Sequence, residues 1–440
     1  MVTSNQIKEA IKKHKLELPR YQKLFDYYIG KHKILSRKLP DKHKPNNKVV
    51  TLYPKKIINT MLGYFASMPL AYVSQSGNQN FLNDIKMINY LNNEEDTNAE
   101  IIKTFSIYGK CYELYFIDRN GNIRFNHYSP LEMYIERDSK NNILFGLRYW
   151  ELKKDDNSKE IKVEVYDENG IYHFISSDGG NTYVSDNNEN DLEHYFGEVP
   201  ITIYLNNEEE QGDFEEIITQ VDAINTLLSD AINSNESFVN AYLILAGYKA
   251  TEKEDIEKMK QDGVLLLDDV GQAKFLTKDA NAEFQNNLYE TLDHLIHEQS
   301  DTPRLTSSKF SSNLSGQALK FHLFGLETKS SMKERKMEKA LRKRIRMIVT
   351  MLNKQGKDYE PSDISFKFSR DIPADEAAIT DQIAKLVNIV PLETLLSWHP
   401  KIQEPSLEIK KLKNGLDSTG LDADLRNRNQ QILGSNNGAE

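Results

Sequence analysis

Residues 283–352 contain the stretch that decides the fold: EFQNNLYETLDHLIHEQS (283–300), DTPRLTSSKFSSNLSG (301–316) and a run from Gln317 to Leu352. The first part has apolar residues three or four positions apart, which predicts a helix with one buried face. These residues are Phe284, Leu288, Leu292, Leu295 and Ile296. The second part holds five serines and two threonines and few apolar residues, so we predict a mobile loop. The third part has helical spacing without proline, which predicts the longest helix of the protein.

The composition is that of a globular protein with several cores. The chain has 440 residues, 39% of them hydrophobic and 10% aromatic, which is enough for two to four domains. A single cysteine, Cys111, excludes an internal disulfide, and the chain opens without a signal-like segment. The longest apolar stretch, Val239 to Gly247, is too short for a bilayer span. We therefore expect a soluble protein made in a reducing cytoplasm, with no membrane partner.

Charge is segregated along the chain. The net charge of −10 argues against a general basic surface for duplex DNA. Residues 206–248 contain no lysine or arginine and nine acidic residues, and residues 279–303 also lack cations. Residues 329–346 reverse the sign, with nine cations against two glutamates. Acidic and basic segments could therefore meet at an interface.

The remaining segments alternate between helical and strand patterns. Ser4 is placed to cap a helix and Pro19 to open another. Residues 31–48 are basic and broken by proline, which predicts an exposed loop that is either a solvated linker or a contact with nucleic acid or another subunit. Residues 110–205 alternate apolar and polar residues between Asn-Gly and Asp-Gly turns, which predicts an antiparallel β region.

The segment after the β region predicts a linker and a second helix. Residues 206–212 read as an acidic linker, followed by a helix of about 30 residues that ends near Gly247. Short strand-like pieces follow around Gly271. Asp118, with Asn120 and Asn122, superficially suggests a calcium loop, but the downstream glutamate of such a loop is missing, so a hairpin turn is favoured.

Several ordered segments resemble the portal proteins of tailed double-stranded-DNA bacteriophages, of the siphovirus type. They are YYIGKHKI (27–34), KPNNKVVTLYPKKIINTMLGYFASMPLAY (44–72), VPITIYLNNEEEQGDFEEIITQVDAINTLLSDAINS (199–234), SGQALK (315–320) and GLETKSSMKERKMEKALRKRI (325–345). The resemblance implies an α+β, mainly helical, ring-forming subunit with the wing, stem, clip and crown of the portal fold.

The resemblance also implies a division of the chain. We expect the wing at 1–211, the first stem helix at 212–247, the clip at 248–282, the second stem helix at 283–299, the channel (tunnel) loop at 300–315, the long wing/crown helix at 316–356, the crown at 357–417 and a disordered tail at 418–440.

The function implied by the resemblance is that of a portal vertex. The ring would pass DNA into the capsid and out of it, and it would be a docking platform for terminase and for head-completion and tail proteins. Expected partners are other copies of the chain in a dodecamer, double-stranded DNA in transit, the terminase large and small subunits, the major capsid and scaffolding proteins, and a head-completion adaptor. The protein would lie at the capsid vertex of the virion, and in the host cytoplasm during assembly.

Enzymatic motifs are missing from the sequence. It has no phosphate-binding loop, no dinucleotide-binding turn and no zinc-protease motif, so we expect no catalytic residue, no cofactor and no metal. His294 and His297 are interpreted as surface or interface residues. Two alternatives remain open: a metal-dependent hydrolase that processes nucleic acid, and a head scaffold or adaptor that forms no ring.

The candidate site residues form three groups. The channel loop is expected to present Arg304, Leu305, Thr306, Ser307, Ser308, Lys309, Phe310, Ser311, Ser312 and Asn313. The two cation-free helices are expected to turn acidic residues toward the channel, namely Glu215, Asp222, Asp230, Glu283, Glu290, Asp293 and Glu298. A subunit or DNA contact is expected from Lys333, Arg335, Lys336, Arg342 and Arg344.

The physical reason for the acidic channel is the charge of DNA. Each phosphate that a cation neutralises adds to affinity, so a basic channel would hold the duplex, whereas an acidic channel would let it slide. Arg304 and Lys309 would touch phosphates weakly. The basic face at 329–346 would meet either a neighbouring subunit or DNA, or would simply be solvated.

Overall fold

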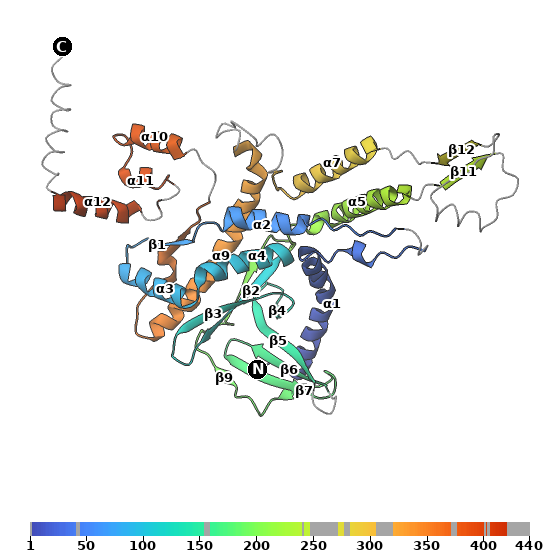
Figure 1. Cartoon of the computed structure of the whole chain (residues 1–440). Coiled ribbons are helices and arrows are strands. Elements are labelled where there is room, and N and C mark those ends of the chain that lie inside the picture. Colours follow the sequence, from blue (N-terminus) through green and yellow to red (C-terminus); the bar gives the residue numbers. More distant parts are fainter. Residues whose placement is uncertain are drawn as a thin grey trace, which may run out of the picture.

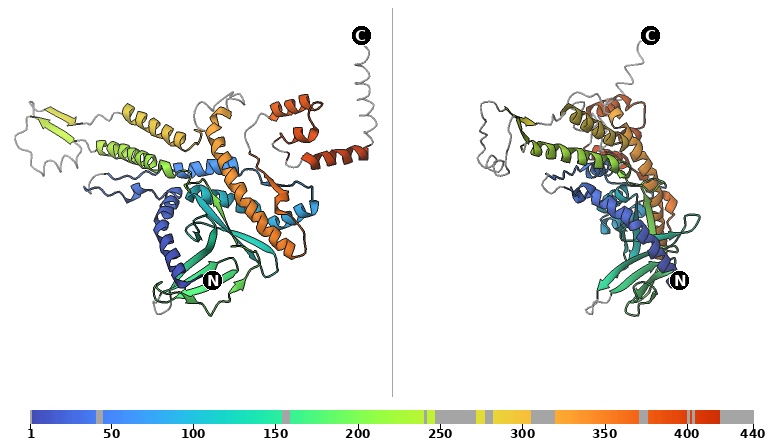
Figure 2. Two further views of the ribbon diagram at one scale, coloured as in Figure 1. Left: turned by 180° about the vertical axis from the view of Figure 1, so that it is seen from behind. Right: turned by 90° about the vertical axis from the view of Figure 1, so that its right-hand side faces the viewer.

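The computed structural model describes residues 2–40, 45–153, 159–239, 242–246, 272–276, 282–304, 320–370, 376–399, 402 and 405–419. Helices and antiparallel sheets alternate over these residues, which confirms the α+β class. A packed body holds most of the helices and sheets. Two helices extend from it side by side toward a small hairpin, and a group of C-terminal helices lies on another side (Figure 1; Figure 2).

The N-terminal helix is continuous, although two helices were predicted. Helix α1 (Ser4–Tyr28) is capped by Thr3 and contains Pro19 in its interior. A proline inside a helix costs about 3 kcal/mol, because it removes a hydrogen bond and crowds the preceding turn. Tyr21, Leu24 and Tyr27 lie beyond the proline and are buried in one core cluster, and this burial offsets that cost.

Several short helices follow α1 in the N-terminal part of the chain. They are the 3₁₀ turn η1 (Lys33–Ser36) and the helices α2 (Tyr53–Phe65), α3 (Gln79–Leu91) and α4 (Glu94–Tyr108). Helix α2 contributes to two neighbouring cores, with Ile57 and Ile58 facing one and Met61 and Phe65 facing the other.

The predicted antiparallel region is confirmed as two sheets. The first has the order β10-β2-β3, from β2 (Lys110–Ile117), β3 (Ile123–Tyr128) and β10 (Ile201–Leu205). The second has the order β4-β5-β6-β7-β8, with β9 also paired to β7. Its strands are β4 (Tyr134–Arg137), β5 (Ile143–Lys153), β6 (Lys159–Tyr166), β7 (Gly170–Ser176), β8 (Val184–Ser185) and β9 (Leu192–Glu193).

The turn between β2 and β3 is a hairpin turn. The Asp118 Oδ1 atom accepts hydrogen bonds from the backbone N–H groups of Asn120 and Asn122, both at 2.9 Å. Gly121 supplies the positive φ of 81° that the turn requires. The carboxylate of Asp118 is thus occupied by its own turn.

The first of the two extending helices is shorter than predicted, whereas the second agrees with its predicted bounds of 283–299 to within one residue. The 3₁₀ turn η2 (Glu215–Ile217) leads into α5 (Ile218–Val239), and α7 (Ala282–Gln299) returns to the body. The predicted continuation of the first helix to Gly247 is wrong, because residues 242–246 form strand β11 (Tyr242–Ala246), paired antiparallel with β12 (Gln272–Leu276). The run YLILA lacks the polar positions of a helical pattern, and it suits a strand once a partner strand is present.

Helix α9 (Phe324–Lys354) is the longest helix among the described residues, as predicted, and it runs diagonally across the body against β10 (Figure 1). It begins later than the predicted residue 316. After the turn η4 (Pro361–Asp363), strand β13 (Ile364–Lys367) pairs with β1 (Ala71–Ser74), so the start of the predicted crown belongs to the packed body. The helices α10 (Glu376–Leu386), α11 (Leu392–Leu396) and α12 (Pro405–Thr419) follow.

Candidate functional site: the extended helix pair and the charges at its base

Helices α5 and α7 are fixed at their base and exposed farther out. Ile224 of α5 and Ile296 of α7 are both fully buried in one core cluster at the base. Farther along, Phe284 of α7 is 62% exposed and Ile232 of α5 is 45% exposed. The prediction that the whole apolar face of residues 283–300 is buried is therefore wrong for its first half, because that half of α7 extends beyond the body.

In its described residues, 31–40 and 45–48, the basic segment contacts α5 of its own subunit, whereas the sequence predicts a solvated linker or a contact with nucleic acid or another subunit. Arg37 donates to the Asp230 carboxylate at 2.7 Å, and the Asn47 side chain donates to Glu236. The backbone N–H of Thr51 donates to the Asn225 side chain at 2.8 Å. The acidic side of α5 is thus partly neutralised by a segment distant in sequence.

Two acidic residues at the start of this region also have partners within the subunit. Asp222 accepts a hydrogen bond from the Tyr27 hydroxyl at 2.7 Å. Glu215 forms a two-pronged ion pair with the Arg20 guanidinium, with both distances 2.7 Å. Glu215 therefore joins η2 to α1, and it does not offer a free charge to a channel.

Asp293 of α7 is buried, which contradicts its prediction as a channel-facing residue. It is 6% exposed and accepts from the Tyr53 hydroxyl at 2.5 Å. Arg304 forms ion pairs with Asp293 at 2.5 Å and with Glu290 at 2.9 Å. The spacing of residues along the sequence could not reveal that Asp293 is buried, since its partners come from α2 and from the chain beyond α7.

Arg304 belongs to the predicted channel loop, 300–315, and is the last residue of that loop that the structure describes. Its guanidinium is occupied by two carboxylates of α7, so it is not a free phosphate contact. The other loop residues of the prediction, Leu305 to Asn313, lie outside the described residues. Of the remaining predicted acidic residues, Glu283 is exposed, and Glu298 is 65% exposed beside His294 at 3.6 Å.

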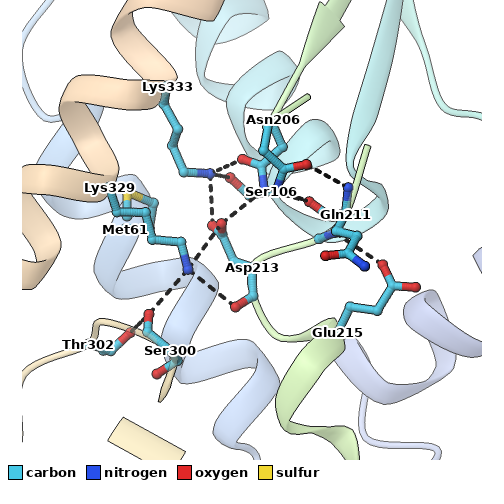
Figure 3. Close-up of polar contacts among 12 residues, drawn as sticks. Met61, Ser106, Asn206, Gln211, Asp213, Glu215, Ser300, Thr302, Lys329 and Lys333 are labelled. Atoms are coloured by element: carbon cyan, nitrogen blue, oxygen red, sulfur yellow. Dashed lines mark hydrogen bonds and ion pairs between the residues drawn. The ribbon is translucent and has the colours of Figure 1, made fainter. Parts of the chain in front are cut away.

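A buried charge cluster joins the base of the extended helices to α9 (Figure 3). Asp213 precedes η2, and its carboxylate lies 2.9 Å from the Lys333 Nζ atom and 3.3 Å from the Lys329 Nζ atom. Lys333 also donates to the Ser106 hydroxyl at 2.8 Å and to the Asn206 side chain. Lys329 donates to the Ser300 carbonyl at 3.1 Å, beyond the end of α7.

The cluster is charged at neutral pH. Burial alone would raise the pKa of Asp213, but the nearby Lys329 and Lys333 outweigh it and lower that pKa to about 2. Burial lowers the pKa of Lys333 to about 8, although Asp213 opposes this shift. Lys333 is 1% exposed, so its prediction as a subunit or DNA contact is wrong.

Close backbone packing positions Asp213. A Cβ atom at Gly212 would lie 2.3 Å from the Ile107 carbonyl oxygen, and one at Gly109 would lie 1.9 Å from the Glu210 carbonyl oxygen. The predicted acidic linker 206–212 is therefore pressed against the end of α4. Lys110 and Arg137 each pair with Glu210 at 2.8 Å.

A second buried charge site holds the middle of α9. The Arg344 guanidinium makes two hydrogen bonds to the Glu113 carboxylate of β2, at 2.6 and 3.0 Å. Tyr204 also donates to Glu113, at 2.8 Å, and both charged side chains are fully buried. Arg344 is therefore a core residue, which contradicts its prediction as a contact with a subunit or DNA.

The other three predicted cations are on the outside of the subunit. Arg335 is exposed, and Arg342 is 70% exposed with an ion pair to Glu338 of its own helix at 2.6 Å. Lys336 pairs with Glu208. The sequence contained a signal that Lys333 and Arg344 are buried, because both lie on the apolar stripe of α9. Lys333 is four residues before Met337, and Arg344 is three residues after Leu341.

The described residues contain no group of three metal-ligating side chains. His297 is buried and bonds to the Asp293 carbonyl at 2.8 Å and to Lys56 at 3.1 Å, so it belongs to the base of α7. Within the described part of the chain, no helix combines the length and apolarity of a bilayer span.

Comparison with known proteins gives consistent matches. Residues 7–419 match the family described as phage portal protein, SPP1 Gp6-like. The chain is 22% identical over 418 residues to the portal protein of Bacillus phage SPP1, covering 88% of this chain and 82% of that protein. It is 24% identical over 219 residues to the portal protein of Clostridium phage phiCD119, covering 48% of each.

Similar solved structures include the neck of an empty GTA particle computed with C6 symmetry. The TM-score is 0.48 at 10% identity, covering 78% of this chain and 89% of that chain. The virion of a native gene transfer agent (GTA) particle matches with a TM-score of 0.45 at 11% identity, covering 77% and 85%.

Proposed function

Since the chain belongs to the SPP1 Gp6-like family of phage portal proteins, we propose that its copies close into a dodecameric ring with α5 and α7 around the central channel. Family membership gives the chain the role of a portal vertex protein, which is structural and not enzymatic, so the hydrolase alternative is set aside. The observation that carries this conclusion is the match over residues 7–419.

The shape of the subunit supports the assignment of the stem. Helices α5 and α7 leave the body together and lead to the β11–β12 hairpin at their far end (Figure 2). We assign the stem to this pair, the clip to the segment between the two helices, the wing to α1–α4 with the two sheets, and the crown to the region from α10. The apolar residues exposed on the outer parts of α5 and α7 suit contacts with neighbouring stems.

The acidic lining of the channel is proposed for α7 in revised form. On α5, Arg37 pairs with Asp230 at 2.7 Å, and on α7 Asp293 is buried. Glu283, Glu290 and Glu298 remain exposed on α7. A duplex that meets these carboxylates gains no phosphate neutralisation, so it slides without being held. The loop at 300–315 is proposed as the narrowest contact.

The proposed partners follow from this role. The ring would pass double-stranded DNA and dock terminase during packaging, and it would later hold a head-completion adaptor. It would contact the major capsid and scaffolding proteins during head assembly. We place the chain at a capsid vertex of the virion, after assembly in the host cytoplasm.

Ring formation is tested on the purified chain by native mass spectrometry and negative-stain microscopy. We expect closed particles of about a dozen copies with a central hole, because head-to-tail contacts of identical subunits close into rings. A chain that stays monomeric over a range of salt and protein concentrations would overturn the proposal.

The channel lining is tested by the double variant Glu283→Lys with Glu298→Lys. We expect intact rings and slower DNA packaging into proheads, since two added cations per subunit would retain phosphates. The matched control is Glu168→Lys, an exposed carboxylate on the β6–β7 turn. Equal packaging rates for the double variant and the control would exclude α7 from the channel wall.

A further inference from the structure

Strand β10 is an edge strand at the bottom of a groove. It pairs with β2 on one side, and no strand among the described residues pairs with its other side. Residues of β10, α9 and the β4–β5 turn line a groove of about 850 Å³ along this edge. An open edge of this kind can accept another extended segment, and proteins commonly cover such edges to prevent unwanted pairing.

The backbone of β10 offers hydrogen-bonding groups to the groove. Just past the end of the β10–β2 pair, the Asn206 N–H donates to the Gly109 carbonyl at 2.9 Å. Bonded positions alternate along an antiparallel pair, so the even-numbered residues of β10 bond to β2. The backbone N–H and C=O groups of Ile203 and Leu205 therefore point away from β2, toward the open edge.

The two faces of β10 meet different elements. Tyr204 packs in one core cluster with Ala340 and Leu341 of α9. Ile203 lies on the other face and packs against the same core cluster as Ile143, at the start of β5. Successive side chains of a strand point to opposite faces. A strand added beside β10 would therefore turn its side chains alternately toward α9 and toward the start of β5.

The groove carries a surplus of positive charge. Its lining holds six cations and three carboxylates, and each of these carboxylates is already paired with a cation of the groove. Lys339 is exposed, and it forms no ion pair within the described part of the chain. Four of the six cations belong to α9, namely Lys336, Lys339, Lys343 and Arg346. The α9 side of the groove therefore favours acidic side chains.

The side of the groove opposite α9 is more apolar. Ile143, Ile203 and Leu205 line it and are partly buried. The β4–β5 turn adds Arg137, which is paired with Glu210. A strand in which apolar and acidic residues alternate fits both sides, because its acidic side chains would face α9 and its apolar side chains would face this wall.

One stretch of the chain has this alternation. Residues 421–425 read LDADL, and this is the only run of five residues in the sequence in which apolar and acidic residues alternate and both ends are apolar. The stretch follows α12 and lies outside the described residues.

We propose that residues 421–425 of this chain bind in the groove as a strand added along β10. Asp422 and Asp424 face the cations of α9, and the three apolar residues face Ile203 and Leu205. The contact covers the open edge of β10 and orders part of the tail that the sequence predicts to be disordered. It is independent of ring closure, since the segment belongs to the chain itself.

The contact is tested by photo-crosslinking of the full chain with a benzophenone amino acid in place of Ala423, which leaves every charge intact. We expect the joined peptide to contain Ile143, Ile203 or Leu205, in a product of one chain or of two. The same probe at Gln430, beyond the segment, is the matched control. Products from Ala423 that lack these groove residues, or the same products from both probes, would overturn the proposal.

Hydrogen–deuterium exchange of the β10 backbone gives an independent readout. The N–H groups of Ile203 and Leu205 exchange slowly when a strand covers them. We expect the double variant Asp422→Lys with Asp424→Lys to speed exchange of the peptide that spans β10 at least about tenfold, because lysines would face the cations of α9. Adding Lys339→Glu should restore part of the protection.

The matched control for the charge variant is Asn427→Lys with Asn429→Lys, which adds two cations just outside the segment. It should leave the exchange of β10 unchanged. Unchanged exchange of the remote strand β6 (Lys159–Tyr166) confirms that each variant is folded.

The other outcomes overturn the proposal without touching the portal role, because neither experiment needs a closed ring. Fast exchange of β10 in the wild-type chain would show that its edge is open. Equally slow exchange in the wild-type chain and in the Asp422→Lys, Asp424→Lys variant would show that something else occupies the groove, such as a different segment of a neighbouring copy.

Discussion

Two buried charge sites hold helix α9, one near its first turns and one near its middle, and they differ in what they join. Arg344 and Glu113 connect α9 to the central strand of the first sheet, and both side chains are 0% exposed. Lys333 and Asp213 connect α9 to the segment from which the proposed stem departs. The first site is part of the core of the proposed wing, whereas the second is a joint between the body and the extended helices.

The two sites also differ in their geometry. Arg344 binds Glu113 through two parallel hydrogen bonds, which fixes the orientation of both groups. Lys333 shares one carboxylate with Lys329 and adds neutral partners from α4 and from the segment after β10. The arginine site therefore holds the core of the body together, while the lysine site holds the base of the proposed stem.

Breaking the arginine site should have the largest effect. Arg344→Met leaves the buried Glu113 carboxylate without its cation, so the free energy of unfolding should fall by about 3–5 kcal/mol. Urea denaturation at pH 7 measures this loss. The double variant Arg344→Met with Glu113→Gln should recover part of it, because Glu113 is then uncharged, while the buried Glu94, 3.5 Å from Arg344, still loses its cation. A double variant as unstable as the single one would contradict this account.

Breaking the lysine site should have a smaller effect that depends on pH. Asp213→Asn should lower the free energy of unfolding by about 2 kcal/mol at pH 7, as expected from the lowered pKa of Asp213. A carboxyl whose pKa is lower in the folded state adds stability above its unfolded pKa and loses it as the pH falls. The stabilities of wild type and variant should therefore converge between about pH 4 and pH 2.

The control for the lysine site is Asp230→Asn, which removes a surface partner of Arg37 on α5. Exposed pairs contribute little, so its stability should follow that of wild type at every pH within about 1 kcal/mol. If Asp213→Asn were less stable than wild type by the same amount at every pH, the charge of the Asp213 carboxylate would not be the cause of the stability loss.

Breaking an exposed ion pair of α9 should have the smallest effect on stability. Arg342→Ala removes the ion pair with Glu338, one helical turn away on the helix surface, where Arg342 is 70% exposed. We expect a loss of about 0.3–0.5 kcal/mol by urea denaturation, reduced further in high salt. A fall in the free energy of unfolding above about 2 kcal/mol would contradict this expectation, because a side chain that is 70% exposed should contribute little to stability.

The sequence by itself determined the elements and the family. The spacing of apolar residues predicts α9 and the buried half of α7, and the Asn-Gly and Asp-Gly turns predict the antiparallel sheets, because both patterns are set by local geometry. The ordered segments at 27–72, 199–234 and 315–345 indicate the portal family. These inferences need no knowledge of distant contacts.

The tertiary structure alone decided which charges are free. Asp293, Lys333 and Arg344 look like surface residues in a charge count, but their partners come from elements 120 to 240 residues away in the chain and enclose them. The same holds for the basic segment on α5 and for Pro19 inside α1. Whether a charge is solvated, neutralised or buried depends on packing between distant segments, and sequence periodicity does not contain that information.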